Sequence, residues 1–380
     1  MRASFSLGRI AGIRIGVHWI VLLIFALLAW GLATSRFPLA YPGYGVGAYI
    51  GAALATSVVF FASLLAHELS HAILARRNGL RANDITLWLF GGVARLSGEA
   101  RNPGAELRIA GIGPLVSLLV GVAFLVAAGL SAKSGFTGLA LAGLAWLGGI
   151  NIALAVFNVI PAAPLDGGRL LRSIIWWRTE DRLKATVWAS RAGQAFGWIL
   201  IALGLVTFFT TRGFGGLWLA LIGWFLVGAA SAERRQALIR DQLGGLAVRD
   251  IMTPNPVTAP GSMSVRELLS SELIRARHST FPLTANGGPP IGLVTFTQIR
   301  RVTERERANT RLRDICCPID QLTQARPEEP AADLLPRLPD CAEGRVLVLS
   351  DATLVGIVSP SDITRALRWL GGPRYDPHRG

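Results

Sequence analysis

Two histidines and a glutamate lie close together in the sequence His67-Glu68-Leu69-Ser70-His71. Residues four apart share one face of a helix, so both imidazoles can bind a single metal ion. Glu68, next to them, is placed to take a proton from water that the ion activates. In a soluble helix the same residues can form a plain polar face. Here the flanking sequence is apolar enough to cross a membrane, where ionisable residues are costly and mark function.

A hydrolytic zinc ion usually has three protein ligands, and the chain offers Asp166 as the third. Asp166 lies in a segment with two prolines and two glycines, which should interrupt the preceding apolar helix. Irregular backbone at membrane depth is tolerated where it lines a cavity. Asp166 is therefore either a ligand or a loop cap, and the nearby histidine motif favours the ligand. We interpret His18 as an interfacial side chain, although it is the first alternative ligand.

The composition predicts a membrane domain and a soluble domain. Hydrophobic residues make up 51% of the 380 residues and charged residues only 16%, against about 25% charged residues in soluble domains. The first apolar stretch follows a basic start but lacks a cleavage site for a signal peptide, so we expect it to be retained. About six stretches are long enough to span, at 17–34, 48–75, 107–130, 137–160, 192–211 and 213–231.

Basic residues are unevenly distributed along the chain, whose formal net charge is +14. Residues 1–231 hold 18 basic and 7 acidic residues, and these basic residues gather in alternate loops. Excess Lys and Arg mark the cytoplasmic side, so we expect both termini to be cytoplasmic. Basic loops beside anionic lipid head groups explain the charge without a nucleic-acid partner. The predicted domains are a membrane domain at 1–231, a linker at 232–247 and a soluble part beyond it.

The histidine motif, followed by Asn158-x-x-Pro161-x-x-Pro164-Leu165-Asp166-Gly167-Gly168-Arg169, resembles the site-2 protease family of intramembrane zinc metalloproteases. Gly111-Ile112-Gly113-Pro114 and the start of the chain are also similar to that family. The resemblance implies one Zn²⁺ bound by His67, His71 and Asp166, with Glu68 as general base. It implies that Asn158 positions the substrate or stabilises the oxyanion. It further implies single-span membrane proteins as substrates, regulated intramembrane proteolysis and a place in the cell membrane.

A short hairpin is predicted between the second and third spans, from Ile85–Phe90 and Val93–Leu96 around two glycines. A substrate helix must unwind before its peptide bonds can be cut, and a hairpin edge can pair with the unwound strand. The alternative is a loop that merely packs against the helices, and the sequence does not choose between them.

The soluble part is an internal duplication with a period of 64 residues. Val248-Arg249-Asp250-Ile251 returns as Leu312-Arg313-Asp314-Ile315, and Gly292-Leu293-Val294-Thr295 returns as Gly356-Ile357-Val358-Ser359. A fixed period across several blocks indicates repeated structural units. They resemble a tandem CBS-domain pair, at 248–307 and 308–370 with a tail at 371–380. The expected fold is thus a polytopic α-helical membrane protein with a membrane-associated β-hairpin, followed by a soluble α/β CBS module.

The CBS resemblance implies a site for an ATP- or AMP-type adenine nucleotide that regulates the protease. Ser359 and Asp362 match the residues that contact ribose and phosphate, as does Thr295 in the first repeat, where Gln298 replaces the aspartate. Asp362 can instead cap its helix, and the module can serve to form a homodimer. The three cysteines do not suggest a disulfide framework, so we expect a reducing compartment.

Two other classes of protein are alternatives to the protease. One is a transporter or channel regulated by the CBS pair, and the other is a non-catalytic relative that binds membrane proteins without cutting them. The intramembrane ionisable residues form a ligand set rather than a path, and Glu68 and the three ligands are intact. Both observations favour the protease.

Overall fold

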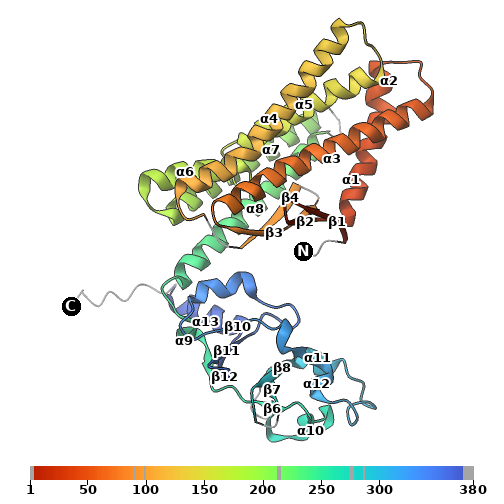
Figure 1. Ribbon diagram of the computed structural model, residues 1–380. Coiled ribbons are helices and arrows are strands. Elements are labelled where there is room, and N and C mark those ends of the chain that lie inside the picture. Colours follow the sequence, from red (N-terminus) through yellow and green to blue (C-terminus); the bar gives the residue numbers. More distant parts are fainter. Residues whose placement is uncertain are drawn as a thin grey trace. The chain divides into compact units, whose positions relative to one another are not determined.

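The computed structural model describes residues 4–88, 91–97, 100–211, 215–273, 278–285 and 287–370. The chain divides into two compact units, Met1–Arg235 and Gln236–Gly380. Figure 1 shows long helices with a small sheet in the first unit and a mixed α/β fold in the second.

Six helical segments of the described residues are long and apolar enough to cross a membrane, which confirms the predicted spans. The first segment, Trp19–Ala40, combines α1 (Trp19–Gly31), a π-helical stretch (Leu32–Arg36) and α2 (Phe37–Ala40). The other five are α3 (Val46–Arg77), α4 (Pro103–Lys133), α5 (Leu139–Val159), α7 (Arg182–Thr211) and α8 (Gly215–Leu243).

Local sequence explains where α3 ends and α4 begins. After α3 the backbone turns at Gly79, whose φ of 82° lies in the region that glycine adopts without strain. α4 begins after Asn102, whose side-chain oxygen accepts a hydrogen bond of 2.8 Å from the amide of Ala105. Pro103 stands at the first helical position, where the missing N–H costs nothing.

The predicted interruption after the fourth span is present. α5 ends at Val159, and the short helix α6 (Asp166–Thr179) begins at Asp166. Glycines let the intervening segment lie against both neighbouring helices. A Cβ on Gly168 of α6 would lie 2.6 Å from the Ala162 carbonyl carbon, and one on Gly193 of α7 would lie 2.9 Å from the Ala163 nitrogen. Larger residues at these positions would therefore displace the segment that leads to Asp166.

Glycines also pack α7 against α8. A Cβ on Gly197 would lie 2.8 Å from the Gly223 carbonyl oxygen, and one on Gly204 would lie 2.6 Å from that of Gly216. Small residues at such spacing allow two membrane helices to approach closely.

A four-stranded sheet lies beside α3, with the order β1 (Phe5–Ile10), β2 (Ile13–Val17), β3 (Arg81–Trp88) and β4 (Gly91–Ser97). The predicted hairpin is confirmed as antiparallel β3 and β4, and β4 is the edge strand. β1 is the other edge strand of the sheet. That β4 pairs with substrate stays a prediction. The hairpin of β1 and β2 was not predicted, although Ala11 and Gly12, both with positive φ, form a tight turn between alternating residues. Ile13 and Ile85 pack the sheet onto Ala72 of α3.

The second unit contains two related four-stranded sheets, in agreement with the predicted CBS pair. They have the orders β6-β7-β8-β9 and β10-β11-β12-β5. The strands are β5 (Thr253–Pro254), β6 (Ala259–Pro260), β7 (Thr280–Thr284), β8 (Pro290–Thr295), β9 (Cys317–Pro318), β10 (Gln324–Ala325), β11 (Val346–Ser350) and β12 (Thr353–Val358). The α-helices are α9 (Val248–Ile251), α10 (Val265–Ser270), α11 (Phe296–Arg300), α12 (Leu312–Ile315) and α13 (Pro360–Leu370), with 3₁₀ turns at Ile319–Gln321 and Ala331–Arg337.

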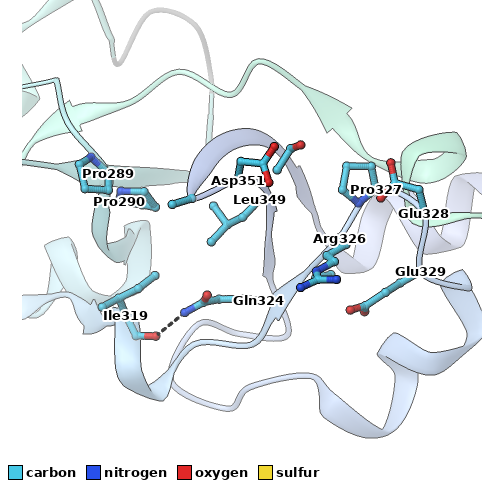
Figure 2. A pocket seen from close by; sticks show the side chains of 13 residues that line it. Pro289, Pro290, Ile319, Gln324, Arg326, Pro327, Glu328, Glu329, Leu349 and Asp351 are labelled. Atoms are coloured by element: carbon cyan, nitrogen blue, oxygen red, sulfur yellow. Dashed lines mark hydrogen bonds between the residues drawn. The ribbon is translucent and has the colours of Figure 1, made fainter.

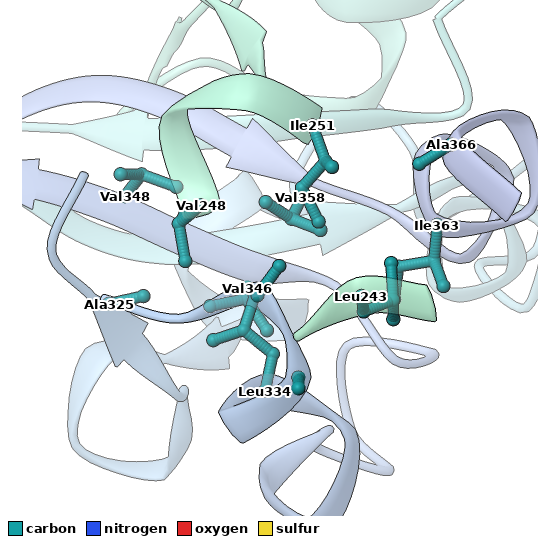
Figure 3. Close-up of a cluster of buried hydrophobic side chains, with 12 residues drawn as sticks. Leu243, Val248, Ile251, Ala325, Leu334, Val346, Val348, Val358, Ile363 and Ala366 are labelled. Carbon is teal, nitrogen blue, oxygen red and sulfur yellow. The ribbon is translucent and has the colours of Figure 1, made fainter. Parts of the chain in front are cut away.

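The two repeats exchange their first strands. β5, which begins the first repeat, pairs with β12 of the second, and β9, which begins the second, pairs with β8 of the first. Figure 3 shows the core of the second repeat, where Val346, Val348 and Val358 are buried. Leu243, the last residue of α8, is fully buried in the same core. Because β5 of the first repeat is a strand of this second sheet, the first repeat helps to complete the fold of the second. α10 ends at Ser270, and residues 274–277 lie outside the described residues.

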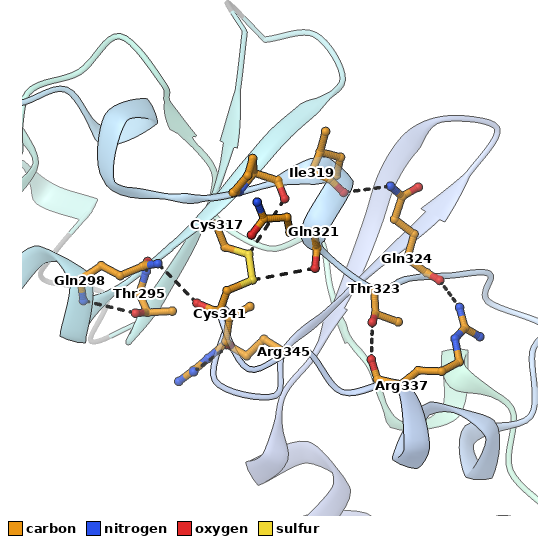
Figure 4. Close-up of a disulfide and its surroundings, with 12 residues drawn as sticks. Thr295, Gln298, Cys317, Ile319, Gln321, Thr323, Gln324, Arg337, Cys341 and Arg345 are labelled. Atoms are coloured by element: carbon orange, nitrogen blue, oxygen red, sulfur yellow. Dashed lines mark hydrogen bonds between the residues drawn. A yellow bond between two sulfur atoms is a disulfide. The ribbon is translucent and has the colours of Figure 1, made fainter. Parts of the chain in front are cut away.

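The structure contains a disulfide, although the three cysteines did not suggest a disulfide framework. The structure joins Cys317 of β9 to Cys341, 24 residues later, and leaves Cys316 as the free cysteine of the described residues (Figure 4). The pattern of cysteines along the sequence gave no sign of this bond. Both cysteines belong to the second repeat, and Cys317 lies in β9, the strand that pairs with β8 of the first repeat.

Candidate metal centre

Three ligand-type side chains from two distant segments meet at the middle of the first unit. His71 Nε2 lies 3.1 Å from Asp166 Oδ2 and 3.2 Å from His67 Nε2, and His67 Nε2 lies 3.3 Å from Asp166 Oδ2. Both histidines are buried, and the Asp166 side chain is 13% exposed. In the described part of the chain this is the one group of three His, Cys, Asp or Glu residues arranged to hold a metal.

The distances fit zinc. Ligand atoms placed tetrahedrally at about 2.0–2.1 Å from an ion lie about 3.3 Å from one another, close to the spacing seen here. Room beside them comes from Gly113 of α4, where a Cβ would lie 2.7 Å from His67 Nε2 and nearer still to His71 Nε2. Two imidazoles and one carboxylate are also a common donor set of hydrolytic zinc sites, with space left for water.

The far nitrogens of the two rings are held by α4. His71 Nδ1 lies 2.6 Å from the carbonyl oxygen of Ile109. A carbonyl only accepts, so Nδ1 carries the proton and Nε2 presents a lone pair to the site. His67 Nδ1 lies 2.9 Å from Ser117 Oγ, which fixes the orientation of its ring. Sequence reasoning missed Ile109 and Ser117, since no motif marks them, whereas Gly113 belongs to a segment noted for its family resemblance.

The other residues predicted for the site lie outside the group of His67, His71 and Asp166. Glu68 follows His67 on α3 and is half-buried, and Asn158 lies in the last turn of α5, also half-buried. Neither position tests the role predicted for it. His18 is the residue before α1 and accepts a hydrogen bond from the Ile20 amide through Nδ1, at 3.4 Å. It caps α1 and is not in the metal-type group.

Comparison with known proteins shows the family of the chain. The profile of Peptidase family M50 matches residues 55–141 and 132–203, which include both histidines and Asp166, and the CBS-domain profile matches residues 248–305. Over 378 residues the chain is 41% identical to Rip3 of Mycobacterium tuberculosis, which is named a zinc metalloprotease, covering 97% of this chain and 93% of that protein. The chain belongs to peptidase family M50.

Two further M50 relatives are similar over shorter stretches. The chain is 36% identical to sll0528 of Synechocystis, also named a zinc metalloprotease, over 72% of this chain and 71% of that one. The solved site-2 protease of Methanocaldococcus jannaschii is 28% identical, covers 61% of this chain and 95% of its own, and has a TM-score of 0.42. From its family and its 41% identical relative, the protein is a multi-pass zinc metalloprotease of family M50 with a CBS domain, and the transporter and channel alternative is set aside.

In the second unit, Ser359 and Asp362 form a compact polar cluster at the start of α13. Asp362 is buried, and its Oδ2 accepts hydrogen bonds from the Ser359 amide at 2.9 Å and the Ser359 hydroxyl at 2.6 Å. Its Oδ1 accepts from Thr253 Oγ1 at 3.2 Å and pairs with Arg365 at 3.0 Å. Ser359 and Asp362 form a reciprocal helix cap, so the capping interpretation holds whether or not a nucleotide binds.

The equivalent positions of the first repeat are held by another segment of the chain. Thr295 and Gln298 also form a reciprocal cap, so glutamine can replace aspartate without loss of the helix start. Thr295 Oγ1 donates to Glu343 at 3.0 Å, and Gln298 Nε2 donates to the Cys341 carbonyl at 3.4 Å. Cys317, 64 residues after Thr253, is bonded to Cys341 (Figure 4). The segment Cys341–Glu343 therefore contacts all three equivalent positions, and we call it the closing segment.

Electrostatics favour this contact. Hydrogen bonds from Thr297, Arg345 and Thr295 outweigh burial and lower the pKa of Glu343 below its usual value. Its carboxylate is therefore charged at neutral pH and accepts the Thr295 hydroxyl.

A separate cavity of about 700 Å³ lies elsewhere in the second unit (Figure 2). Its lining includes Leu349 of β11 and Asp351 at the turn before β12, with Arg326 and Glu328 across from them. Ser359 and Asp362 follow the opposite end of β12, and a six-residue strand is about 20 Å long. The cavity is therefore not the predicted nucleotide site.

Proposed function

We propose that this protein is an intramembrane endopeptidase that cuts the membrane-spanning segments of single-span proteins. The observation that supports it is the meeting of His67, His71 and Asp166, buried and about 3.2 Å apart, with the histidines inside a predicted span. Ionisable residues at that depth are retained for function. Their donor atoms and spacing suit zinc, and they would bind it together.

The residues around the site have different roles in the proposed reaction. When bound, zinc polarises the scissile carbonyl and lowers the pKa of water toward neutrality. Glu68, which follows His67, accepts the proton of the attacking water and returns it to the leaving amine. Ser117 and the Ile109 carbonyl keep both imidazoles turned toward the site. Asn158, near the interruption after α5, would hold the substrate carbonyl or its oxyanion.

We also place the protein in the cell membrane with both termini in the cytoplasm. The excess of basic residues in alternate loops supports this orientation. It puts the CBS pair in the cytoplasm, where adenine nucleotides are present, and basic loops beside anionic lipids.

The ligand set is tested by metal analysis of Asp166→Ala. Two histidines alone are a poor zinc site, so purified variant protein should hold far less than one zinc per chain. Asp241→Ala, which removes an exposed aspartate of α8, is the matched control and should keep its zinc. Undiminished zinc in Asp166→Ala would show that another residue is the third ligand.

A second proposal concerns the CBS pair, which we infer to bind an adenine nucleotide at Ser359 and Asp362 and so to regulate cleavage. It is supported by the polar cluster at the start of α13, where hydroxyls of Thr253 and Ser359 surround a buried carboxylate. At the Thr295 position the closing segment already occupies the corresponding contacts. Homodimerisation through the CBS pair is the alternative role.

A further inference from the structure

An arginine in α6 joins three helices of the first unit. Arg172 Nε donates to Glu106 Oε1 of α4 at 2.8 Å, with a second, shorter contact from Nη2 to the same oxygen, and Nη1 donates to Glu233 Oε1 of α8 at 2.9 Å. Glu106 is 1% exposed, and the Arg172 side chain is 15% exposed. A buried carboxylate is retained only with a good partner, so this cluster is a fixed feature of the fold. The reaction described above does not use it.

The α4 partner of Arg172 lies on the helix face that shapes the metal centre. Glu106, Ile109, Gly113 and Ser117 follow one another at intervals of three and four residues, which places them on one side of α4. Ile109 holds His71, Ser117 holds His67, and Gly113 leaves room for the ion. One face of α4 thus orients both histidines and, one turn earlier, binds Arg172.

The third ligand belongs to the helix that carries Arg172. Asp166 is the first residue of α6, and Arg172 follows it by six residues, or about 9 Å of helix. In the described part of the chain, the Asp166 carboxylate contacts His71 and His67, and no side chain of α4 hydrogen-bonds to it. Its position relative to the histidines therefore depends on how α6 is held against α4.

We propose that Arg172 is a positioning residue for the metal centre: by binding Glu106 it locks α6 to the face of α4 that orients the histidines, and so sets Asp166 at bonding distance from the ion. Glu233 supplies the second carboxylate that fixes the guanidinium plane. This inference rests on the proposed ligand set His67, His71 and Asp166.

The test compares Arg172→Lys and Arg172→Gln with Arg178→Gln, an exposed arginine on the same helix. Lysine keeps the charge beside Glu106 but lacks the planar fork that engages two carboxylates. Zinc affinity is measured on the full-length purified protein by competition with a chromophoric chelator. The geometry of the site is read from the absorption spectrum of the Co²⁺-substituted protein, and the thermal unfolding of the metal-free protein reports on the fold.

We expect Arg172→Lys to unfold near the wild-type temperature, to bind zinc about 10-fold more weakly, as loss of an outer support commonly does, and to show an altered Co²⁺ spectrum. Arg178→Gln should match the wild type in all three. If Arg172→Gln does not fold, the zinc affinity and Co²⁺ spectrum of Arg172→Lys decide whether Arg172 positions the site. Wild-type zinc affinity and Co²⁺ spectrum in folded Arg172→Lys would overturn the inference. Asp166→Ala separates the two proposals, because if it too keeps zinc, the ligand set itself is wrong.

Discussion

At the scale of single residues, the metal centre requires a glycine in α4, because the side chain of any other residue at that position would collide with the two histidines. This glycine is Gly113, and a Cβ added to it would lie against the Nε2 atoms of both histidines. Those atoms must keep their lone pairs free for an ion. A methyl group there would occupy the space that the ion needs.

Gly113→Ala should therefore lose zinc and proteolysis while α4 remains a helix, since alanine is the better helix former. Gly129→Ala is the matched control on the same helix, because nothing lies within 4 Å of its added Cβ. Bound zinc per chain and thermal unfolding should be measured for both. Wild-type zinc content in Gly113→Ala would contradict the placement of the ion beside α4.

The sequence predicted the donors but not their supports. A spacing of four residues is enough to place His67 and His71 on one helix face, and the prolines and glycines around Asp166 indicated a break in the span. Ser117 and Ile109 could not be predicted, because their contribution depends on the angle at which α4 crosses α3. The contact to Ile109 is made by its backbone carbonyl, which every residue type has, so the sequence does not indicate it.

At the scale of elements, the two CBS repeats have the same fold and differ in what contacts the start of the following helix. In the second repeat Asp362 binds Thr253 and Ser359. In the first, the closing segment Cys341–Glu343 takes these contacts and is tied to β9 by the disulfide.

Cys341→Ser should loosen the closing segment, since Glu343 would then be held by hydrogen bonds alone. We expect faster amide hydrogen exchange over residues 341–345 in the full-length protein, and the same change on adding dithiothreitol to the wild type. Cys316→Ser, which removes the unpaired cysteine, should leave exchange unchanged. Equal exchange in Cys341→Ser and the wild type would show that the disulfide does not hold the segment.

Element prediction succeeded where a pattern was long and failed where it was short. Six apolar stretches and a 64-residue period predicted the spans and the paired repeats. The hairpin of β1 and β2 was missed, because five- and six-residue strands at a basic N-terminus resemble the start of a signal peptide. The disulfide was missed because the spacing of the three cysteines does not indicate which of them meet in the fold.

At the scale of the whole molecule, α8 runs without a break from Gly215 to Leu243, past the boundary between the two units at residue 235. The sequence suggested a separate linker from 232. A ligand of the CBS pair can change cleavage only by its different affinities for two states of the protein.

Asp362→Ala tests whether the CBS pair senses nucleotides. Loss of a charged hydrogen-bond partner should weaken adenine-nucleotide binding by about 1–3 kcal/mol and remove any nucleotide dependence of cleavage. Gln298→Ala, at the position 64 residues earlier, should have a much smaller effect, because the closing segment already covers it. Calorimetry on the full-length protein gives the affinities. No nucleotide binding to the wild type would leave homodimerisation as the role of the module.

The most direct test of the central claim compares Glu68→Gln with the wild type in cleavage of a reporter that spans a lipid vesicle, with bound zinc measured in the same samples. The substitution removes the base and keeps His67, His71 and Asp166. We predict full zinc content and no cleavage in the variant, with cleavage within the spanning segment by the wild type. Cleavage by Glu68→Gln at the wild-type rate would contradict the account, as would a wild-type protein that holds zinc and never cuts.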